Sequence, residues 1–255
     1  MPLWLQAWFW GLVGGSALLL GAAVGYFGRI GQRIIGGIMA FGGGVLISAL
    51  AFELMDKAHK QGGFDATAIG FVSGAVLFSA ANMTLARYGA KHRKRSGHHE
   101  VHRQPSEAED TGSGLAIAIG ALLDGIPESI AIGVGLLLGE SVGIAMVAAV
   151  FLSNVPEALS SSSGMKRAGR SPAYIFGVWG GIALLASLAS LVGCLLFGHF
   201  SPDVRAATIA FAAGAILAML ADTMIPEAFH EAHEFAGLIT VLGFLTAFML
   251  TKLHS

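Results

Sequence analysis

Apolar residues fill this chain in long runs, and short polar segments separate the runs. Each run has about 20 residues, which is the length that one transmembrane helix needs. The pattern therefore predicts an all-α integral membrane protein, with eight transmembrane helices in a single transmembrane domain that spans residues 1–255. The runs cover residues 4–27, 34–55, 66–86, 114–138, 141–163, 173–197, 204–225 and 235–252.

Composition agrees with this pattern. The chain is 55% hydrophobic and only 12% charged, and its mean hydropathy is +0.71. These values exclude an ordinary soluble domain, so a lipid bilayer is the expected surrounding. A net charge of −1 without a basic, aromatic-rich patch gives no reason to expect nucleic acid as a partner. The single Cys194 excludes a disulfide framework and a cysteine-based metal site.

Basic residues predict the orientation. With an external N-terminus, three inner segments, at 29–33, 87–103 and 166–170, hold 11 of the 15 Lys and Arg residues. Because basic residues favour the cytoplasmic side, both termini are expected to be external. The expected location is the inner (plasma) membrane of the cell, with several crossings.

The longest polar stretch covers residues 88–113. It begins with a basic run at 91–95, continues with His98, His99 and His102, and ends in acidic residues. Its composition predicts a disordered cytoplasmic loop. Two interpretations of its histidines stay open: loose binding of zinc or a related metal, or a solvated loop that only fixes the topology.

A faint internal repeat links residues 41–51 with residues 211–221. Four of the 11 aligned positions are identical, and most others are small or aliphatic in both copies. The two segments run in opposite directions in the predicted topology, which gives an inverted repeat around the fourth and fifth helices, as in many secondary transporters. The alternative is a composition that membrane helices share.

Two Pro-Glu pairs stand inside apolar runs, Pro127-Glu128 and Pro156-Glu157. A carboxylate in hydrocarbon costs at least about 2.5 kcal/mol, so such residues usually face a polar cavity or a cation. Proline removes a helical hydrogen bond and kinks the helix. No Lys, Arg or His stands between residues 115 and 165. We therefore expect a cation site between two broken helices; the alternative is a pair of packing kinks whose glutamates bind basic residues.

Further oxygen donors stand close to these glutamates in the sequence. Asp124 precedes Glu128 by four residues and Asn154 precedes Glu157 by three, so each pair shares one face of a helix. The predicted metal ligands are therefore carboxylates and an amide. Such a set suits Mn, Mg or Fe(II) better than a histidine-containing set does, although zinc also accepts carboxylates.

A second candidate for metal contact follows the seventh run. His230 and His233 are three residues apart, which would place them on one helix face beside carboxylates and make them a metal exit point. A charged helix end is the competing interpretation. Glu53 and Asp222 either line the ion path or are interfacial charges.

These features together resemble the ZIP family of divalent-metal transporters: eight crossings, external termini, an inner histidine-containing loop and Pro-Glu motifs in the fourth and fifth helices. The resemblance covers nearly the whole chain. In that family, side chains of the two motifs form one metal site or two adjacent ones halfway across the membrane. Glu128, Glu157 and their prolines fall on the family positions, and Asn154 keeps a polar position.

The match to the family motif is partial. Asp124 stands where the fourth-helix His is usual, Gly125 where Asn is usual, and Ser129 where Gly is usual. Ser153 stands in the histidine position of the fifth helix. The sixth run has no acidic residue, so a ligand that some members place there is missing.

The resemblance implies transport of divalent metal ions (Zn, Fe or Mn) into the cytoplasm, with the ion as substrate and no prosthetic cofactor. A homodimer is one possible assembly. The alternative function is a non-transporting homologue that binds metal or regulates a partner. An enzyme is not expected, because the chain lacks a His-Glu-x-x-His motif and the Pro-Glu motifs offer no nucleophile with a base.

Overall fold

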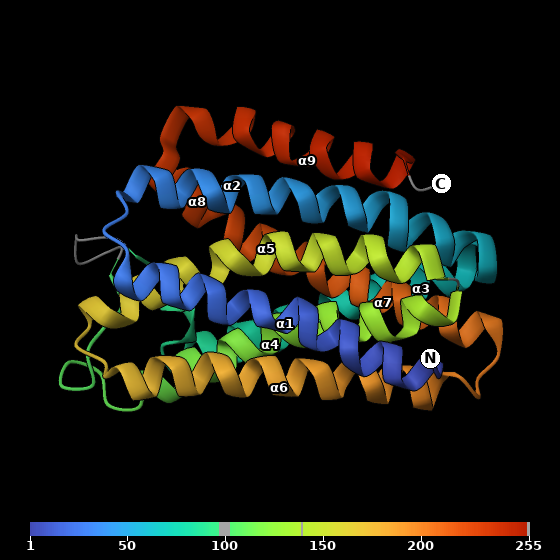
Figure 1. Ribbon diagram of the computed structural model, residues 1–255, viewed down its shortest axis with the longest axis horizontal. Helices are drawn as coiled ribbons and strands as arrows, with labels where there is room; N and C mark the ends of the chain where they lie inside the picture. Colours follow the sequence, from blue (N-terminus) through green and yellow to red (C-terminus); the bar gives the residue numbers. More distant parts are fainter. Residues whose placement is uncertain (97–102, 139, 254–255) are drawn as a thin grey trace.

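The computed structural model describes residues 1–96, 103–138 and 140–253. Every regular element in these three ranges is a helix, and none is a strand. Successive helices run back and forth along the long axis of one bundle (Figure 1). The prediction of an all-α protein is confirmed.

The long helices cover the predicted apolar runs closely, except that α3 begins earlier than predicted. A π-helix follows α2 and another follows α7, and short 3₁₀ turns follow α4 and α8. The elements are α1 (Leu3–Phe27), α2 (Gln32–Ala49), α3 (Asp56–Ala86), α4 (Ser113–Gly135), α5 (Glu140–Arg167), α6 (Pro172–Phe197), α7 (Pro202–Met219), α8 (Ile225–Ala232) and α9 (Ala236–Leu253).

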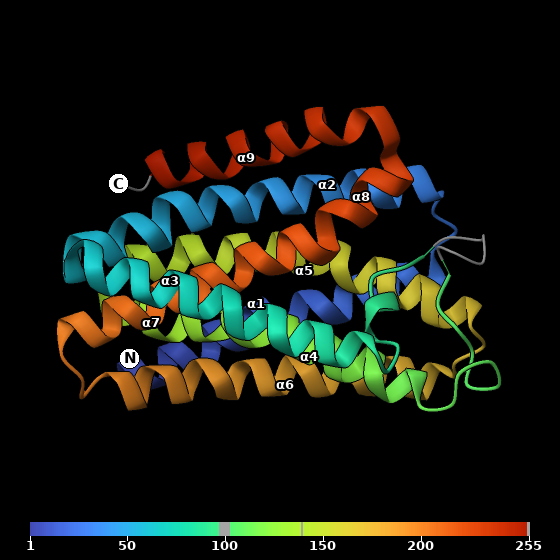
Figure 2. The same ribbon diagram turned by 180° about the vertical axis from the view of Figure 1, so that it is seen from behind.

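Within the described residues, five helical stretches are long and apolar enough to cross a membrane. Two of them exceed the length of one crossing, with 55 residues in Gln32–Ala86 and 51 in Pro202–Lys252. Gly63, with φ 67°, interrupts the first, and His233, with φ 51°, interrupts the second. The chain reverses direction near both (Figures 1 and 2). The fold is therefore compatible with a multi-pass membrane protein, and the number of eight crossings stays a prediction.

Apolar side chains lie on the outside of the bundle as well as inside. Met39, Leu46 and Ile132 belong to the buried core, whereas one face of α6 exposes large apolar side chains, including Leu184 and Leu188. A helix that is apolar on all sides suits a protein interior or a lipid surrounding. This distribution supports the membrane interpretation.

Glycines allow the backbones of α3 and α7 to touch. A Cβ at Gly74 would overlap the carbonyl oxygen of Phe211, and a Cβ at Gly214 would overlap the carbonyl oxygen of Phe71. Small residues let membrane helices approach closely in this way. The contact joins the third and seventh predicted runs.

The two segments of the predicted repeat share a structural detail. The π-helix after α2 covers Leu50–Met55, and the one after α7 covers Leu220–Met224. Leu50 and Leu220 are aligned positions of the repeat, so the helices change geometry at the same point. That the repeat is inverted stays a prediction.

The ends of the bundle differ. The start of α1 and the end of α9 lie at one end, and the connections 28–31 and 168–171 lie at the other, together with the described parts of the connection between α3 and α4 (Figures 1 and 2). The basic connections are thus grouped opposite the termini. Which end faces the cytoplasm stays a prediction.

Candidate functional site

Two carboxylates of α4 lie inside the bundle near the middle of that helix. Asp124 and Glu128 are each only 1% exposed. The helix continues through Pro127, and Ser129 Oγ donates a hydrogen bond of 2.7 Å to the carbonyl of Gly125. The expectation of a broken fourth helix is therefore wrong, but the two acids share a buried face as their spacing predicts.

The polar residues of α5 divide between two roles. Glu157 is buried, and α5 also continues through its proline, Pro156. Asn154 Nδ2 donates a hydrogen bond of 3.0 Å to the carbonyl of Gly14 in α1, and Ser153 Oγ donates one of 3.0 Å to Val150 of its own helix. Asn154 and Ser153 thus make packing contacts here, and Glu157 is the fifth-helix residue that turns to the acids of α4.

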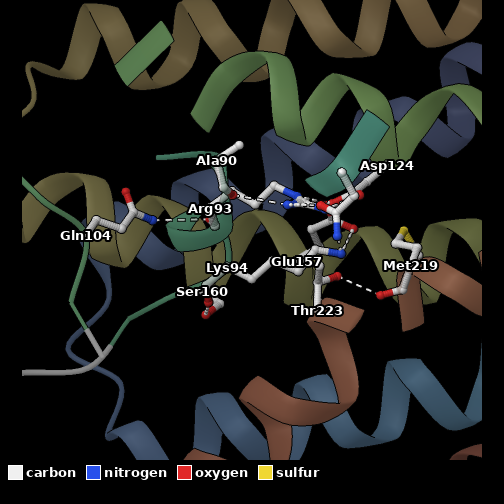
Figure 3. A network of polar contacts seen from close by, with 10 residues as sticks. Ala90, Arg93, Lys94, Gln104, Asp124, Glu157, Ser160, Met219 and Thr223 are labelled. Carbon is white, nitrogen blue, oxygen red and sulfur yellow. Dashed lines mark hydrogen bonds and ion pairs between the residues drawn. The ribbon is translucent and has the colours of Figure 1, made fainter. Parts of the chain in front are cut away.

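Arg93 enters this group from the connection between α3 and α4. Its Nε lies 2.7 Å from Asp124 Oδ2 and its Nη2 lies 2.8 Å from Asp124 Oδ1, which is a bidentate ion pair (Figure 3). Its Nη1 donates to Asn82 Oδ1 at 3.0 Å and to the carbonyl of Ala90 at 3.1 Å. The guanidinium is almost fully buried. Fork geometry with several donors satisfied is the favourable way to bury an arginine.

Lys94 joins the two acidic helices. Its Nζ lies 3.1 Å from Asp124 Oδ2 on α4 and 3.3 Å from Glu157 Oε2 on α5 (Figure 3). Both contacts are ion pairs, but neither has the alignment of a hydrogen bond. The ammonium therefore compensates charge without the directional contacts that Arg93 makes.

Backbone contacts hold this basic segment, residues 90–96, against α5. Ser160 Oγ donates a hydrogen bond of 2.6 Å to the carbonyl of Lys94. Gln104 Nε2 lies 3.2 Å from the carbonyl of Arg93, 3.1 Å from that of Arg95 and 3.0 Å from that of Ser161 on α5. The Gln104 side chain thus joins the basic segment to α5, the helix that carries Glu157.

A second clamp fixes the end of the connection at the start of α4. The Glu107 carboxylate accepts hydrogen bonds from the N–H groups of Gly112, at 2.8 Å, and Gly114, at 2.7 Å, and it pairs with Arg170 Nη1 at 2.8 Å. The Gly112 N–H, the Arg170 side chain and the Gly114 N–H lower the pKa of Glu107. An anion at a helix N-terminus also interacts favourably with the helix dipole.

These contacts correct two predictions. Arg93, Lys94, Ser96 and Gln104 are buried, so the prediction of disorder is wrong for these four residues. The expectation that a cation site, and not basic side chains, answers the buried glutamates is corrected for Glu157, which pairs with Lys94, because this partner precedes α4 in the chain. His98, His99 and His102 lie outside the described residues.

Glu128 differs from the other two acids. Its Oε1 has no hydrogen-bond partner within the described ranges. Glu157, Lys94 and Asp124 are the charged groups that act on it electrostatically. The site therefore holds three carboxylates but only two cationic side chains, and the carboxylate of Glu128 is the one left over.

A small cavity of about 190 Å³ adjoins the basic segment. Asp222 and Glu227 contribute carboxylates to its wall, and Glu227 Oε1 accepts a hydrogen bond of 3.4 Å from the Ser96 N–H. The full wall consists of Lys91, Arg93, Lys94, Arg95, Asp222, Thr223, Pro226, Glu227 and His230. The basic segment thus separates this cavity from the buried acids.

The two histidines of the second candidate metal contact, His230 and His233, line different cavities. His230 lies on α8 at the cavity wall, but α8 ends at Ala232, and His233 has the left-handed φ of 51°. His233 lines a different cavity, with Arg33 and Glu234. The prediction that both share one helix face is wrong, because the helix ends between them. Glu53, in turn, pairs with Lys57 at 2.8 Å.

The residues that sequence reasoning missed are Arg93, Lys94 and Gln104. One signal for them is present in the sequence, namely a charge imbalance. The apolar runs contain several acids, and the basic run at 91–95 is the densest cluster of cations in the chain. Across the described ranges, no three His, Cys, Asp or Glu side chains converge closely enough to hold one metal ion. The arrangement is an ion-pair network in which, among the described residues, Glu128 is the one of the three buried site carboxylates that lacks an ion pair.

No protein-family model and no curated protein sequence matches this chain.

Proposed function

We propose that this protein carries divalent metal ions across a membrane, with Asp124, Glu128 and Glu157 as the residues that bind the ion. The observation that carries the proposal is Glu128, a buried carboxylate whose Oε1 has no hydrogen-bond partner in the described part of the chain, beside two further buried carboxylates. Acids inside a membrane bundle mark ion pathways because burying them is otherwise unfavourable. The resemblance of the Pro-Glu motifs to the ZIP family supports the same conclusion.

The chemistry of the donors favours hard cations. The three proposed ligands supply only carboxylate oxygens, while Asn154 and Ser153 are engaged elsewhere. Oxygen donors suit Mn²⁺, Mg²⁺ and Fe²⁺, and zinc accepts them as well. Mn²⁺ is therefore the ion of choice for a first test.

The proposal includes a topology. Gln32–Ala86 and Pro202–Lys252 would each cross the membrane twice and α5 once, which gives eight crossings with an inverted repeat around α4 and α5. The reversals at Gly63 and His233 and the matched π-helices support this arrangement. The grouping of the basic connections opposite the termini supports external termini in a plasma membrane and uptake toward the cytoplasm.

Uptake of Mn²⁺ into proteoliposomes tests the function. Glu128→Gln and Glu157→Gln each remove one charge from the shared ligand set, so we expect each to reduce the initial rate by at least about tenfold, equivalent to about 1.4 kcal/mol. Asp65→Asn is the matched control, because Asp65 is an exposed carboxylate near the turn at Gly63. Equal Mn²⁺ flux in the wild type and all three variants would overturn the proposal.

A second candidate is a non-transporting protein in which these acids only hold the helices together. The observation that favours it is the engagement of Asp124 by two cations in a network with no converging metal donors. It predicts that the glutamate variants lose stability and that no variant conducts Mn²⁺. The uptake experiment separates the two functions.

A further inference from the structure

The basic segment occupies the place where the proposed function requires the metal ion. Lys94 Nζ lies between Asp124 of α4 and Glu157 of α5, at 3.1 and 3.3 Å, and Arg93 covers both oxygens of Asp124. Together the two side chains bring two positive charges, which is the formal charge of one divalent cation. The segment and a metal ion would thus compete for the same oxygens.

We propose that residues 90–96 act as a tethered cation that closes the carboxylate site, so that a divalent ion binds only when this segment leaves. This inference rests on the proposed function and names how the same site is regulated. Binding of the ion and docking of the segment are then mutually exclusive, and each weakens the other by the same factor.

The surface that receives the segment is shaped for it. A Cβ at Gly120 of α4 would lie 2.7 Å from Arg93 Cδ, and a Cβ at Gly164 of α5 would overlap the carbonyl oxygen of Arg95. Ser160 and Gln104 bind the backbone of the segment, whatever its side chains. The two acidic helices therefore leave room for this backbone in addition to attracting its charges.

The contacts between the basic segment and the buried acids are also incomplete, which favours release of the segment. Lys94 has ion pairs without hydrogen-bond alignment, and the Oε1 of Glu128 stays unpartnered. A buried ion pair recovers only part of the desolvation cost of its charges. A metal ion would coordinate the carboxylate oxygens directly and neutralise Glu128 as well. The cavity of about 190 Å³ beside the segment gives it space toward Asp222 and His230.

The carboxylate site should have an affinity for metal ions that the docked segment masks. If the docked segment excludes the ion, the apparent dissociation constant equals the intrinsic one divided by the fraction of molecules in the undocked state. A change that undocks the segment without touching the acids should therefore tighten binding. Gly164→Ala is such a change, because its new methyl group meets Arg95 and Gln104, which holds the segment, and not Asp124, Glu128 or Glu157.

The experiment combines two measurements on the full-length protein. Undocking is measured as the rate at which a maleimide modifies a cysteine at Ser96, a buried position, in a Cys194→Ser background. Metal affinity is measured by equilibrium binding of radioactive Mn²⁺. Gly177→Ala on α6 is the matched control, since its Cβ would meet nothing within 4 Å.

We expect Gly164→Ala to accelerate labelling and to tighten Mn²⁺ binding by at least about tenfold, with Gly177→Ala unchanged. Mn²⁺ should also accelerate labelling in the parent protein. The double variant Arg93→Gln/Lys94→Gln removes both tethered charges and should tighten binding likewise, which keeps the test decisive if Gly164→Ala fails to fold or to undock the segment.

The outcomes separate the two proposals. If labelling accelerates while Mn²⁺ affinity stays equal to that of the parent, the segment does not compete with metal and the inference is overturned, although the proposed function stands. If no variant binds Mn²⁺ even with the segment released, the carboxylates are not a metal site, and both proposals fail.

Discussion

Asp124 and Glu128 stand one helical turn apart on α4, and both are almost completely buried. Asp124 has a bidentate arginine and a lysine, whereas the Oε1 of Glu128 has no partner in the described part of the chain. The same helix face therefore contains one compensated and one uncompensated acid. Burial of a carboxylate alone does not indicate how its charge is balanced.

The reach of the basic segment explains the difference. Arg93 is fixed by its contact to Asn82 and by the hydrogen bond that Ser160 Oγ donates to the carbonyl of Lys94, so its guanidinium ends at Asp124. Lys94 pairs with Asp124 of α4 and with Glu157 of α5. Asp124 therefore contacts the basic segment directly, whereas Glu128 Oε1 accepts no hydrogen bond from it within the described residues.

Asp124→Asn should give the largest effect on this comparison. The variant leaves Arg93 and Lys94 without their main counter-charge, and breaking a buried ion pair in this way costs about 3–5 kcal/mol. We expect release of the basic segment, measured as faster maleimide labelling at position 96 in the Cys194→Ser background. Labelling at the parental rate would mean that backbone contacts alone hold the segment.

Glu128→Gln should have a smaller effect of opposite sign on stability. A neutral amide is less costly to bury than an unpaired carboxylate, so we expect unfolding in detergent to require about 1 kcal/mol more. Labelling at position 96 should not change, because Glu128 Oε1 accepts no hydrogen bond from the segment within the described residues. A loss of stability as large as that of Asp124→Asn would show that the two acids are equivalent after all.

Acidification should weaken the docking of the segment through His92, with the smallest effect of the three. Burial, then the charges of Arg95 and Lys91, lower the pKa of His92 from 6.5 to about 4, while Asp110 opposes the shift. Docking that requires neutral His92 is fully favourable above pH 6.5 and weakens as the pH falls from 6.5 toward 4. Because His92 is half exposed, labelling at position 96, divided at each pH by the rate of a free thiol such as N-acetylcysteine, should rise by at most about tenfold between pH 7.5 and 5.5.

His92→Asn is the control for this titration, since asparagine does not ionise in that range. Its labelling rate, divided by that of the free thiol at the same pH, should be the same at pH 7.5 and 5.5. An undiminished pH dependence in that variant would assign the effect to another group.

Much of the fold follows from the sequence because apolar length is a local property. The runs that predict α1 and α6 coincide closely with those helices. The turn at His233 was harder to predict, because histidine rarely adopts positive φ and no Gly or Pro marks the helix end. The number of membrane crossings depends on how such turns divide the two longest stretches.

The acids of the site also follow from the sequence, since a carboxylate within an apolar run is visible without a structure. Their partners do not. Arg93 contacts Asp124 across 31 residues of sequence, and tertiary packing, including that of Gly120 and Gly164 against the segment, brings them together. Composition made residues 88–113 look disordered, because buried Arg and Lys are exceptional and depend on a prearranged counter-charge.

The position of the basic segment in the chain has a consequence for biosynthesis. Arg93 and Lys94 precede Asp124, Glu128 and Glu157, so the ribosome releases the counter-ions before any of the acids. In the proposed topology, the cations that neutralise Asp124 are therefore synthesised before α4 enters the bilayer. Lys94 is likewise synthesised before α5 and Glu157. Among the three acids, Glu128 would enter the bilayer without an ion-pair partner from the basic segment.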